Sequence, residues 1–280
     1  MQAKPPSSRK APTLTCVIAS TARTGSYFLS DLMKNTGRLG LPKEFFNPHI
    51  DKDHLTAGMS KPLPVEADSV TWRCALVDAN GTTPNGVAAF KVFPGHFQWL
   101  LNGISLSAWF PNIRWLHLAR EDKVGQAISW AIARQTETWW GKRDVSAPAP
   151  IYSAVEIEAM LLQILAEEAD WSAYFLRNQI LPHRISYEAL EREPAATVAA
   201  IAAFLGVQLD QPADTRTTRV KQRAALEEEW RARFFRDAGS LDRLDPPSLR
   251  RYAPRTPGTL RKFLQGKLVV GPLPERFRDE

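Results

Sequence analysis

The segment Ser20-Thr-Ala-Arg-Thr-Gly-Ser26 carries four hydroxyl side chains and one arginine around a single glycine, a set of groups suited to binding an anion. It follows the apolar run at residues 14–19, which is typical of a buried strand. After Gly25 the apolar residues recur at helical spacing. A strand, a tight turn and a helix in this order present backbone N–H groups and a helix N-terminus to a phosphate. The segment therefore predicts an anion-binding loop in which Arg23 supplies a fixed positive charge.

Two common phosphate-binding signatures do not match this loop. A nucleotide triphosphatase loop needs an earlier glycine and a lysine directly after its second glycine, but no lysine follows Gly25. A dinucleotide-binding fingerprint needs three spaced glycines, and here Gly25 stands alone. On the loop alone, a strand, turn and helix that bind nothing remain an alternative.

Length and composition indicate a folded protein with a core of ordinary size. The chain has 280 residues, of which 44% are hydrophobic and 24% are charged, so disorder throughout is not expected. The formal net charge of +6 suits an anionic ligand, nucleic acid or an acidic membrane. Because Lys and Arg are interspersed with Asp and Glu rather than gathered in a stripe, we do not expect a nucleic-acid-binding module.

The first residues and the cysteines bear on location and metal binding. Residues 1–12 are polar, so no secretory leader is expected, and no apolar run is long enough to span a bilayer. Cys16 and Cys74 are the only two cysteines, and neither they nor the histidines have metal-ligand spacing. We therefore expect a cytoplasmic protein that holds no metal.

Predicted strands alternate with predicted helices along the chain. Strands are expected at 14–19, 87–93, 113–118 and 184–187, and helices from 25 onward and at 67–79, 94–101, 123–135, 153–178, 195–205 and 222–237. This alternation predicts an α/β three-layer sandwich, in which helices flank a central, mostly parallel sheet and ligands bind at the carboxyl ends of the strands. Residues 50–65 are expected to be irregular. We expect a disordered arm at 1–13, one domain at 14–240 and an Arg- and Pro-rich tail at 241–280.

Three passages resemble signatures of sulfotransferases. Arg23-Thr-Gly-Ser-Tyr27 resembles their 5′-phosphosulfate loop. His117-Leu-Ala-Arg120 followed by Ser129 resembles the strand end and helix that hold a 3′-phosphate in that family. Ser186-Tyr-Glu-Ala-Leu190 is similar to a structural Tyr-Glu-x-Leu segment. One departure is the acidic Glu121 directly after Arg120, which would weaken the local positive field.

Within that superfamily the chain most resembles the bacterial trehalose 2-sulfotransferase-like family. The similar passages follow one another in order from about residue 14 to 235. They are Pro42-Lys-Glu-Phe-Phe46, Thr83-Pro-Asn-Gly-Val87 leading to Lys91, Asp122 to Ser129, Arg134-Gln-Thr136 with Trp139, and Lys221-Gln-Arg223 with Trp230.

The resemblance implies a fold and a reaction. The fold is a P-loop-like α/β sandwich, and the reaction moves a sulfuryl group from 3′-phosphoadenosine 5′-phosphosulfate (PAPS) to a hydroxyl of a carbohydrate or glycolipid-like acceptor. It also implies a possible homodimer. The donor-binding residues it implies are Arg23, Thr24, Gly25, Ser26, Tyr27, Arg120, Ser129, Gln222 and Arg223.

The resemblance also suggests roles in catalysis. Glu44 is expected to be the general base, with His96 as the runner-up because a histidine does this work in other sulfotransferases. Arg23 is expected to stabilise the leaving 5′-phosphate. Lys91 either polarises the sulfate or neutralises the end of the sheet. The residues expected to line the acceptor site are Phe45, Gln135 and Trp139.

A nucleotide-binding regulatory protein without turnover is the alternative function. It would keep the donor site but transfer nothing to any acceptor. Donor binding with no transfer across a panel of acceptors would favour it over the enzyme.

Overall fold

The computed structural model describes residues 12–50, 52–57, 59, 63, 69–139, 149–211, 214 and 224–238. The chain divides into two compact units, Met1–Arg233 and Phe234–Glu280, and the sheet lies in the first. Most of the expected arm at 1–13 and all of the expected tail at 241–280 lie outside the described residues.

A parallel sheet forms the centre of the first unit. Its strands are β1 (Leu14–Ser20), β2 (Val87–Val92), β3 (Ile113–Ala119) and β4 (His183–Ser186), in the order β2-β1-β3-β4. All three strand pairings are parallel. β2 is buried along its whole length, because a parallel sheet is covered by helices on both faces and its strands become continuous apolar runs.

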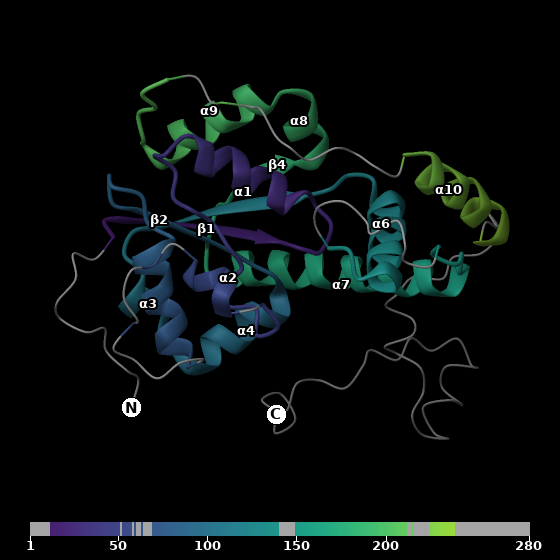
Figure 1. Ribbon diagram of the computed structural model, residues 1–280, viewed down its shortest axis with the longest axis horizontal. Coiled ribbons are helices and arrows are strands. Elements are labelled where there is room, and N and C mark those ends of the chain that lie inside the picture. Colours follow the sequence, from purple (N-terminus) through teal and green to yellow (C-terminus); the bar gives the residue numbers. More distant parts are fainter. Residues whose placement is uncertain are drawn as a thin grey trace, which may run out of the picture. The chain divides into compact units, whose positions relative to one another are not determined.

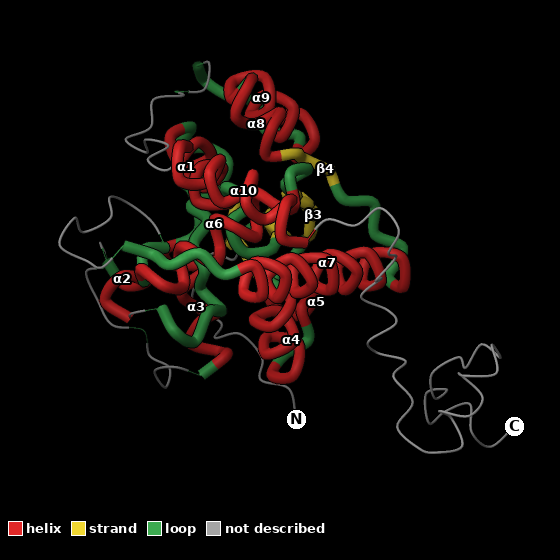
Figure 2. The backbone as a smooth tube through the Cα atoms, turned by 90° about the vertical axis from the view of Figure 1, so that its right-hand side faces the viewer, coloured by secondary structure: helices red, strands yellow, loops and turns green. Residues whose placement is uncertain are grey.

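Helices cover both faces of this sheet (Figures 1 and 2). One face carries α1 (Ser26–Asn35), α8 (Tyr187–Arg192) and α9 (Pro194–Leu205), and the other carries α3 (Val70–Asn80), α4 (Pro94–Gly103) and α7 (Ala154–Arg177). Two hydrophobic clusters match these faces. Val17 and Ala19 of β1 belong to one cluster, and Cys16 and Ile18 belong to the other, as the alternation of side chains along a strand requires. The predicted three-layer α/β fold is confirmed.

Side-chain caps fix where several helices begin. Asp122 accepts a hydrogen bond from the Gly125 amide at the start of α6 (Lys123–Thr136), and Ser153 accepts one from Glu156 at the start of α7. Such caps satisfy backbone donors that the first helical turn leaves without partners. The remaining helices are α2 (Lys52–Thr56), α5 (Leu106–Trp109) and α10 (Ala224–Ala238).

The structure contains short helices that the sequence did not predict, among them α5, and one strand ends earlier than expected. Residues 50–65 were expected to be irregular, but α2 lies within them. The fourth strand was expected to include Tyr187, but β4 ends at Ser186 and Tyr187 begins α8. The cause is local, since the Ser186 hydroxyl accepts a hydrogen bond from the Ala189 amide and so starts the helix.

The register of the sheet brings four strand ends together. Ala19 of β1 lies opposite Val92 of β2, Ser20 lies opposite Leu118 of β3, and Ala119 lies opposite Ser186 of β4. The loops that follow β1, β2 and β3 and the start of α8 therefore meet at one edge, which is where parallel sheets bind ligands.

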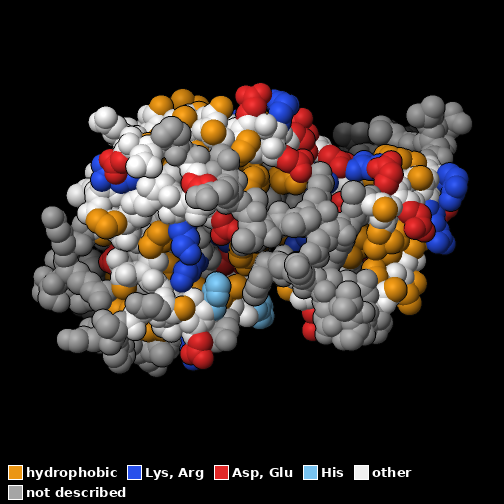
Figure 3. Space-filling view, turned by 45° about the horizontal axis from the view of Figure 1, so that its top comes forward, with side chains coloured by type: hydrophobic (Ala, Val, Ile, Leu, Met, Phe, Trp, Pro, Cys, Tyr) orange, Lys and Arg blue, Asp and Glu red, His pale blue; other side chains and the backbone are white. Residues whose placement is uncertain are grey.

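On the face drawn in Figure 3, Lys and Arg side chains lie in several separate places, most of them beside acidic side chains. The described residues of this face carry no continuous basic stripe. None of the helices in the described part of the chain is long and apolar enough to cross a membrane.

Replacing Phe90 by Ala should lower the free energy of unfolding by about 3–5 kcal/mol. The ring is fully buried and packs against Phe46 and Phe110, with centroids 5.1 and 5.0 Å away. Urea unfolding measures the loss. The matched control is Leu181→Ala, at a side chain that is 91% exposed, and it should change the free energy by no more than about 0.5 kcal/mol. Equal losses in the two variants would contradict this view of the core.

Candidate functional site

Protein side chains bind three consecutive carbonyl groups at the end of β1. The Trp171 indole Nε1 donates to the Ser20 carbonyl at 2.9 Å, and the Thr24 hydroxyl donates to the Thr21 carbonyl at 3.0 Å. The Gln126 amide donates to the Ala22 carbonyl at 2.6 Å. Carbonyl oxygens repel anions, so this arrangement favours anion binding by the N–H groups of the same loop.

The helix that follows this loop begins without a side-chain cap. Gly25 is the N-cap of α1, with a φ of 78°, and it has no side chain to cap the first turn. The backbone donors at a helix N-terminus and the helix dipole together attract an anion. A Cβ at Gly25 would also collide with the Tyr187 ring, 2.7 Å from its Cε2. Both the backbone angle and the close approach therefore require glycine here.

Arg23 occupies an unfavourable backbone conformation within the loop. Its φ is 64°, in the left-handed region that residues other than glycine seldom adopt. Strain of this kind is found mainly at functional sites. Its guanidinium Nε donates to the Ser129 hydroxyl at 3.1 Å, and Nη1 donates to the Trp139 carbonyl at 2.6 Å. Arg23 thus links the loop to α6 and to the segment that follows α6.

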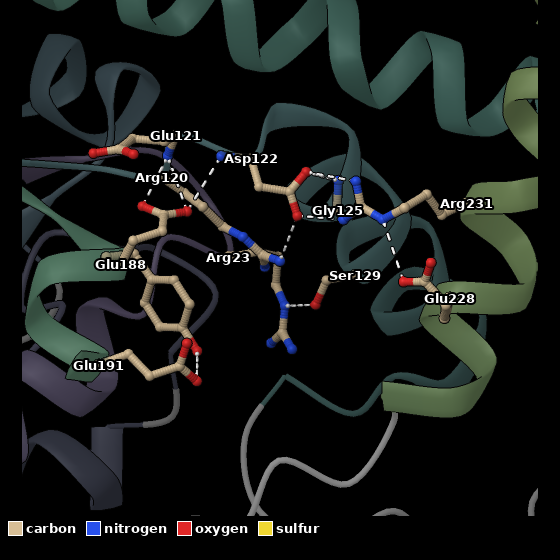
Figure 4. A network of polar contacts seen from close by, with 11 residues as sticks. Arg23, Arg120, Glu121, Asp122, Gly125, Ser129, Glu188, Glu191, Glu228 and Arg231 are labelled. Carbon is tan, nitrogen blue, oxygen red and sulfur yellow. Dashed lines mark hydrogen bonds and ion pairs between the residues drawn. The ribbon is translucent and has the colours of Figure 1, made fainter.

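Arg120 comes from the end of β3 and lies near Arg23 (Figure 4). The Arg120 Nη2 atom lies beside Gly125, 2.7 Å from the position that a Cβ would take there. Arg23 contacts Ser129. Gly125 and Ser129 are four residues apart in α6, so they lie on one helix face with about 5–6 Å between their Cβ positions. Two arginines from different strand ends therefore approach the same face of α6, one turn apart.

Tyr187 joins the loop to Arg120. Its ring lies against Gly25, as the collision with a Cβ there shows, and the Arg120 guanidinium lies 5.2 Å from the ring centroid. The Arg120 side chain is 12% exposed, and its Nε has no hydrogen-bond partner among the described residues. A buried donor of this kind is costly unless it finds an acceptor, which makes Arg120 suited to binding an anion.

Acidic groups surround Arg120 in a defined pattern. Asp122 contacts Arg120, Arg231 and the Gly125 amide. Burial alone would raise the pKa of Asp122, but hydrogen bonds from Arg231 and Gly125 and the charges of both arginines outweigh it and lower the pKa to about 2. Glu121 was expected to weaken the positive field at Arg120, but its side chain is exposed and points away from the Arg120 guanidinium (Figure 4).

A second charged group lies beside α1. The Glu44 carboxylate pairs with the Lys91 ammonium at 3.1 Å, with both side chains almost fully buried, and also accepts a hydrogen bond from Asn47 at 2.8 Å. Burial raises the pKa of Glu44, but Lys91 and Asn47 outweigh it and hold the pKa below its ordinary value near 4.5. The Lys91 ammonium also lies 2.9 Å from the centroid of the Tyr27 ring. Glu44 is thus connected through Lys91 to the first turn of α1.

His96, the alternative base, lies on α4, close enough to Glu44 to help lower the pKa of that carboxyl group. Burial lowers the pKa of His96 below its ordinary value of 6.5, and the Glu44 carboxylate offsets only part of this shift. His96 is therefore neutral at pH 7, a state in which an imidazole nitrogen is able to accept a proton.

The other predicted residues fall into different settings. Phe45 is fully buried in the hydrophobic core and offers no ring surface to an acceptor. The Gln135 amide bonds the Ile151 backbone and Glu156, and so holds the segment before α7. Trp139 is 40% exposed beside Arg23, and Ser26 is buried at the start of α1. Gln222 and Arg223 lie outside the described residues.

Four residues that shape the site were not predicted for these roles. Gln126 and Trp171 hold the loop carbonyls, Tyr187 separates Gly25 from Arg120, and Arg231 holds Asp122. The sequence signals a turn at Asp122, because Asp is favoured as an N-cap before a helix. The contacts of these four residues come from distant parts of the chain. Gln126 and Tyr187 lie in passages that resemble the family, but the resemblance assigned neither residue these contacts.

Comparisons with known proteins identify the class to which this fold and site belong, the sulfotransferases. A family model described as Stf0 sulphotransferase matches residues 15–237. The chain belongs to the Stf0 sulphotransferase family and is an enzyme of that kind. The predicted family is thereby confirmed.

Two curated relatives are trehalose 2-sulfotransferases. The protein from Mycobacterium tuberculosis (strain ATCC 35801 / TMC 107 / Erdman) is 28% identical over 262 residues, covering 80% of this chain and 96% of the relative. The protein from Mycolicibacterium smegmatis is 28% identical over 260 residues, covering 81% and 96%. Among solved structures, a sulfotransferase from Alicyclobacillus acidocaldarius is 17% identical with a TM-score of 0.41, covering 86% of this chain and 100% of that one.

Replacing Lys91 by Met should destabilise the protein by about 3–5 kcal/mol at pH 7, because it leaves the Glu44 carboxylate buried without its partner. In the natural protein the pKa of Glu44 is lowered, so its contribution to stability is present above pH 4.5 and is lost as the pH falls through the folded-state pKa. In the variant, burial raises the pKa of Glu44 instead. The variant should therefore regain stability, relative to the natural protein, as the pH falls from 7 towards 4.5.

Urea unfolding at a series of pH values measures this difference. Lys43→Met is the matched control, since Lys43 precedes Glu44 but its ammonium donates to the His54 carbonyl. If the free energy of unfolding of Lys91→Met and of the natural protein changed in parallel with pH, Glu44 and Lys91 would not be coupled in this way.

Proposed function

We propose that the protein transfers a sulfuryl group from PAPS to a hydroxyl of a carbohydrate or glycolipid-like acceptor. The loop after β1 is the main support for this proposal. Side chains bind three of its carbonyl groups, and the helix that follows it begins without a side-chain cap. Arg23 and Arg120 lie close to this loop. The curated relatives, which are named for the sulfation of a disaccharide, support the choice of acceptor class.

The residues at this edge fit a doubly phosphorylated nucleotide. The N–H groups from Thr24 to Tyr27 and the Arg23 guanidinium would hold its 5′-phosphate, as a helix N-terminus and an arginine do for other phosphates. Arg120, whose buried Nε has no acceptor among the described residues, would hold the 3′-phosphate together with Ser129. Gln222 and Arg223 are proposed to complete the donor site. When bound, the donor supplies an activated sulfuryl group on its 5′-phosphate.

Arg23 is proposed to stabilise the negative charge that the 5′-phosphate gains as its bond to sulfur breaks. Donors already fixed in position act strongly on charge that develops in the transition state. The Arg23 guanidinium is fixed by Ser129 and the Trp139 carbonyl. Lys91 lies beside Tyr27, in the first turn of α1, and is proposed to add positive charge on the other side of the loop.

Glu44 is proposed to take the proton of the acceptor hydroxyl. Because its pKa is lowered, the carboxylate is ionised at neutral pH and is ready to accept a hydrogen bond from that hydroxyl. Its pair with Lys91 fixes its position. Trp139 is 40% exposed and its backbone carbonyl is bonded to Arg23, and its ring is proposed as a stacking surface for a sugar.

Incubation with PAPS labelled in its sulfuryl group, and with a panel of disaccharides and glycolipids, tests this function. Labelled product is expected, and Arg23→Ala should lower kcat on the order of 100-fold. Arg192→Ala is the control, because that side chain is 70% exposed and pairs only with its neighbour Glu193 among the described residues. No transfer to any acceptor from a protein that binds PAPS would contradict the proposed transfer and favour a nucleotide-binding protein without turnover.

Glu44→Gln and His96→Asn separate the two candidate bases. Glu44→Gln should lower kcat by about 10²- to 10⁴-fold, the contribution expected of a positioned base, whereas His96→Asn should lower it less than about tenfold. Steady-state kinetics with the same donor and acceptor measures both. The reverse order of losses would assign the base to His96. Circular dichroism of each variant checks that the fold is kept.

A further inference from the structure

The Asp122 carboxylate lies where it would compete with a phosphate for the Arg120 guanidinium. Its Oδ2 lies 3.2 Å from Nη2 of Arg120, the proposed 3′-phosphate anchor. A carboxylate and a phosphate bind a guanidinium through the same pair of N–H groups. If Asp122 engaged Arg120 fully, the net charge offered to the phosphate would be close to zero.

Arg231 of α10 binds the Asp122 carboxylate from the side opposite Arg120. Its Nη1 donates to Asp122 Oδ1 at 2.9 Å, and its Nη2 contacts Oδ2. Both carboxylate oxygens are thus held by one planar guanidinium, the geometry in which arginine binds a carboxylate best. The hydrogen bond to Asp122 is the largest cause of the raised pKa of Arg231.

The three charged groups meet at a glycine. A Cβ at Gly125 would lie 2.5 Å from Arg231 Nη2 and 2.7 Å from Arg120 Nη2, and it would also collide with Asp122. Both guanidinium groups therefore occupy the space that a side chain at residue 125 would take. Figure 4 shows Arg120 and Arg231 approaching Asp122 from opposite sides.

Arg120 itself keeps most of its donors. Within the described part of the chain its guanidinium donates only to Asp122, in a single hydrogen bond, and its Nε has no acceptor. Glu188, the other carboxylate nearby, is engaged by the backbone N–H groups of Glu121 and Asp122. The balance of charge around Arg120 is therefore decided by Asp122 and Arg231.

We propose that Arg231 is a positioning residue for the donor: by holding both oxygens of Asp122, it leaves the Arg120 guanidinium to the 3′-phosphate. Helix α10 is then part of the donor site without touching the donor. With Arg231 in place, Arg120, Asp122 and Arg231 together carry one net positive charge, and the Glu228 carboxylate that lies 3.7 Å from Arg231 Nε is 76% exposed to solvent, which screens it. Without it, Asp122 pairs with Arg120 and opposes the phosphate. This inference rests on the proposed function, since it requires a 3′-phosphate at Arg120.

Calorimetric titration with 3′-phosphoadenosine 5′-phosphate tests it on the full chain. Arg231→Ala should raise Kd about tenfold, the loss expected when one charged hydrogen-bonding partner is cancelled. The Kd of adenosine 5′-monophosphate, which lacks the 3′-phosphate, should change by less than about twofold. Arg236→Ala, an exposed arginine of the same helix, is the matched control and should leave both affinities unchanged.

A rescue separates positioning from structural support. Asp122→Asn removes the competing charge but keeps an oxygen that is able to cap α6. The double variant Asp122→Asn/Arg231→Ala should therefore bind 3′-phosphoadenosine 5′-phosphate within about threefold of the natural protein. A double variant as weak as Arg231→Ala alone would overturn the proposal, because Arg231 would then act directly on the ligand or by docking α10. An Arg231→Ala variant with unchanged Kd would overturn it too.

If the proposed function itself is wrong, the same titrations give a different result. If the natural protein does not bind 3′-phosphoadenosine 5′-phosphate at all, the donor assignment is wrong. If it binds this ligand and only the pattern among the variants fails, the donor assignment stands and the role of Arg231 is wrong.

Discussion

The site depends on the hydrogen bonds that buried side chains make to the carbonyl groups at the end of β1. Trp171 of α7 and Gln126 of α6 reach this loop from outside it, and Thr24 reaches it from within. Trp171 is itself fixed in the aromatic core, where it stacks on Phe175 with 5.8 Å between the ring centroids. The packing of the core thus fixes the backbone of the loop, and the loop backbone decides which groups an anion meets.

Two charged clusters lie on either side of this loop, and each keeps a carboxylate ionised. At the end of β2, Lys91 holds Glu44 with its pKa lowered, and the ammonium contacts Tyr27 in the first turn of α1. At the end of β3, Arg120 and Arg231 hold Asp122 with a pKa of about 2. In the proposed function the first cluster would supply the proton acceptor and the second the phosphate anchor, with the helix N-terminus of α1 between the two.

The sequence predicted those parts of the site that lie within single elements. The loop around Arg23 was predicted because a strand, a small polar turn and a helical stripe adjoin each other, and Arg120 was predicted from the resemblance of its strand end to a family signature. Gln126, Trp171 and Tyr187 were not, since each acts on a loop to which it is close only in the folded chain. Phe45 shows the opposite case: the resemblance implied that it lines the acceptor site, but its ring is fully buried.

We propose that the protein holds one ligand by both of its phosphates, with Arg120 at the 3′-phosphate. The most direct test is the ratio of affinities for 3′-phosphoadenosine 5′-phosphate and adenosine 5′-monophosphate, measured by calorimetry in the natural protein and in Arg120→Ala. A charged hydrogen bond contributes about 1.5–3 kcal/mol, so the natural protein should prefer the bisphosphate by about tenfold or more, and Arg120→Ala should lose that preference while binding the monophosphate as before. The same preference in both proteins would contradict the account.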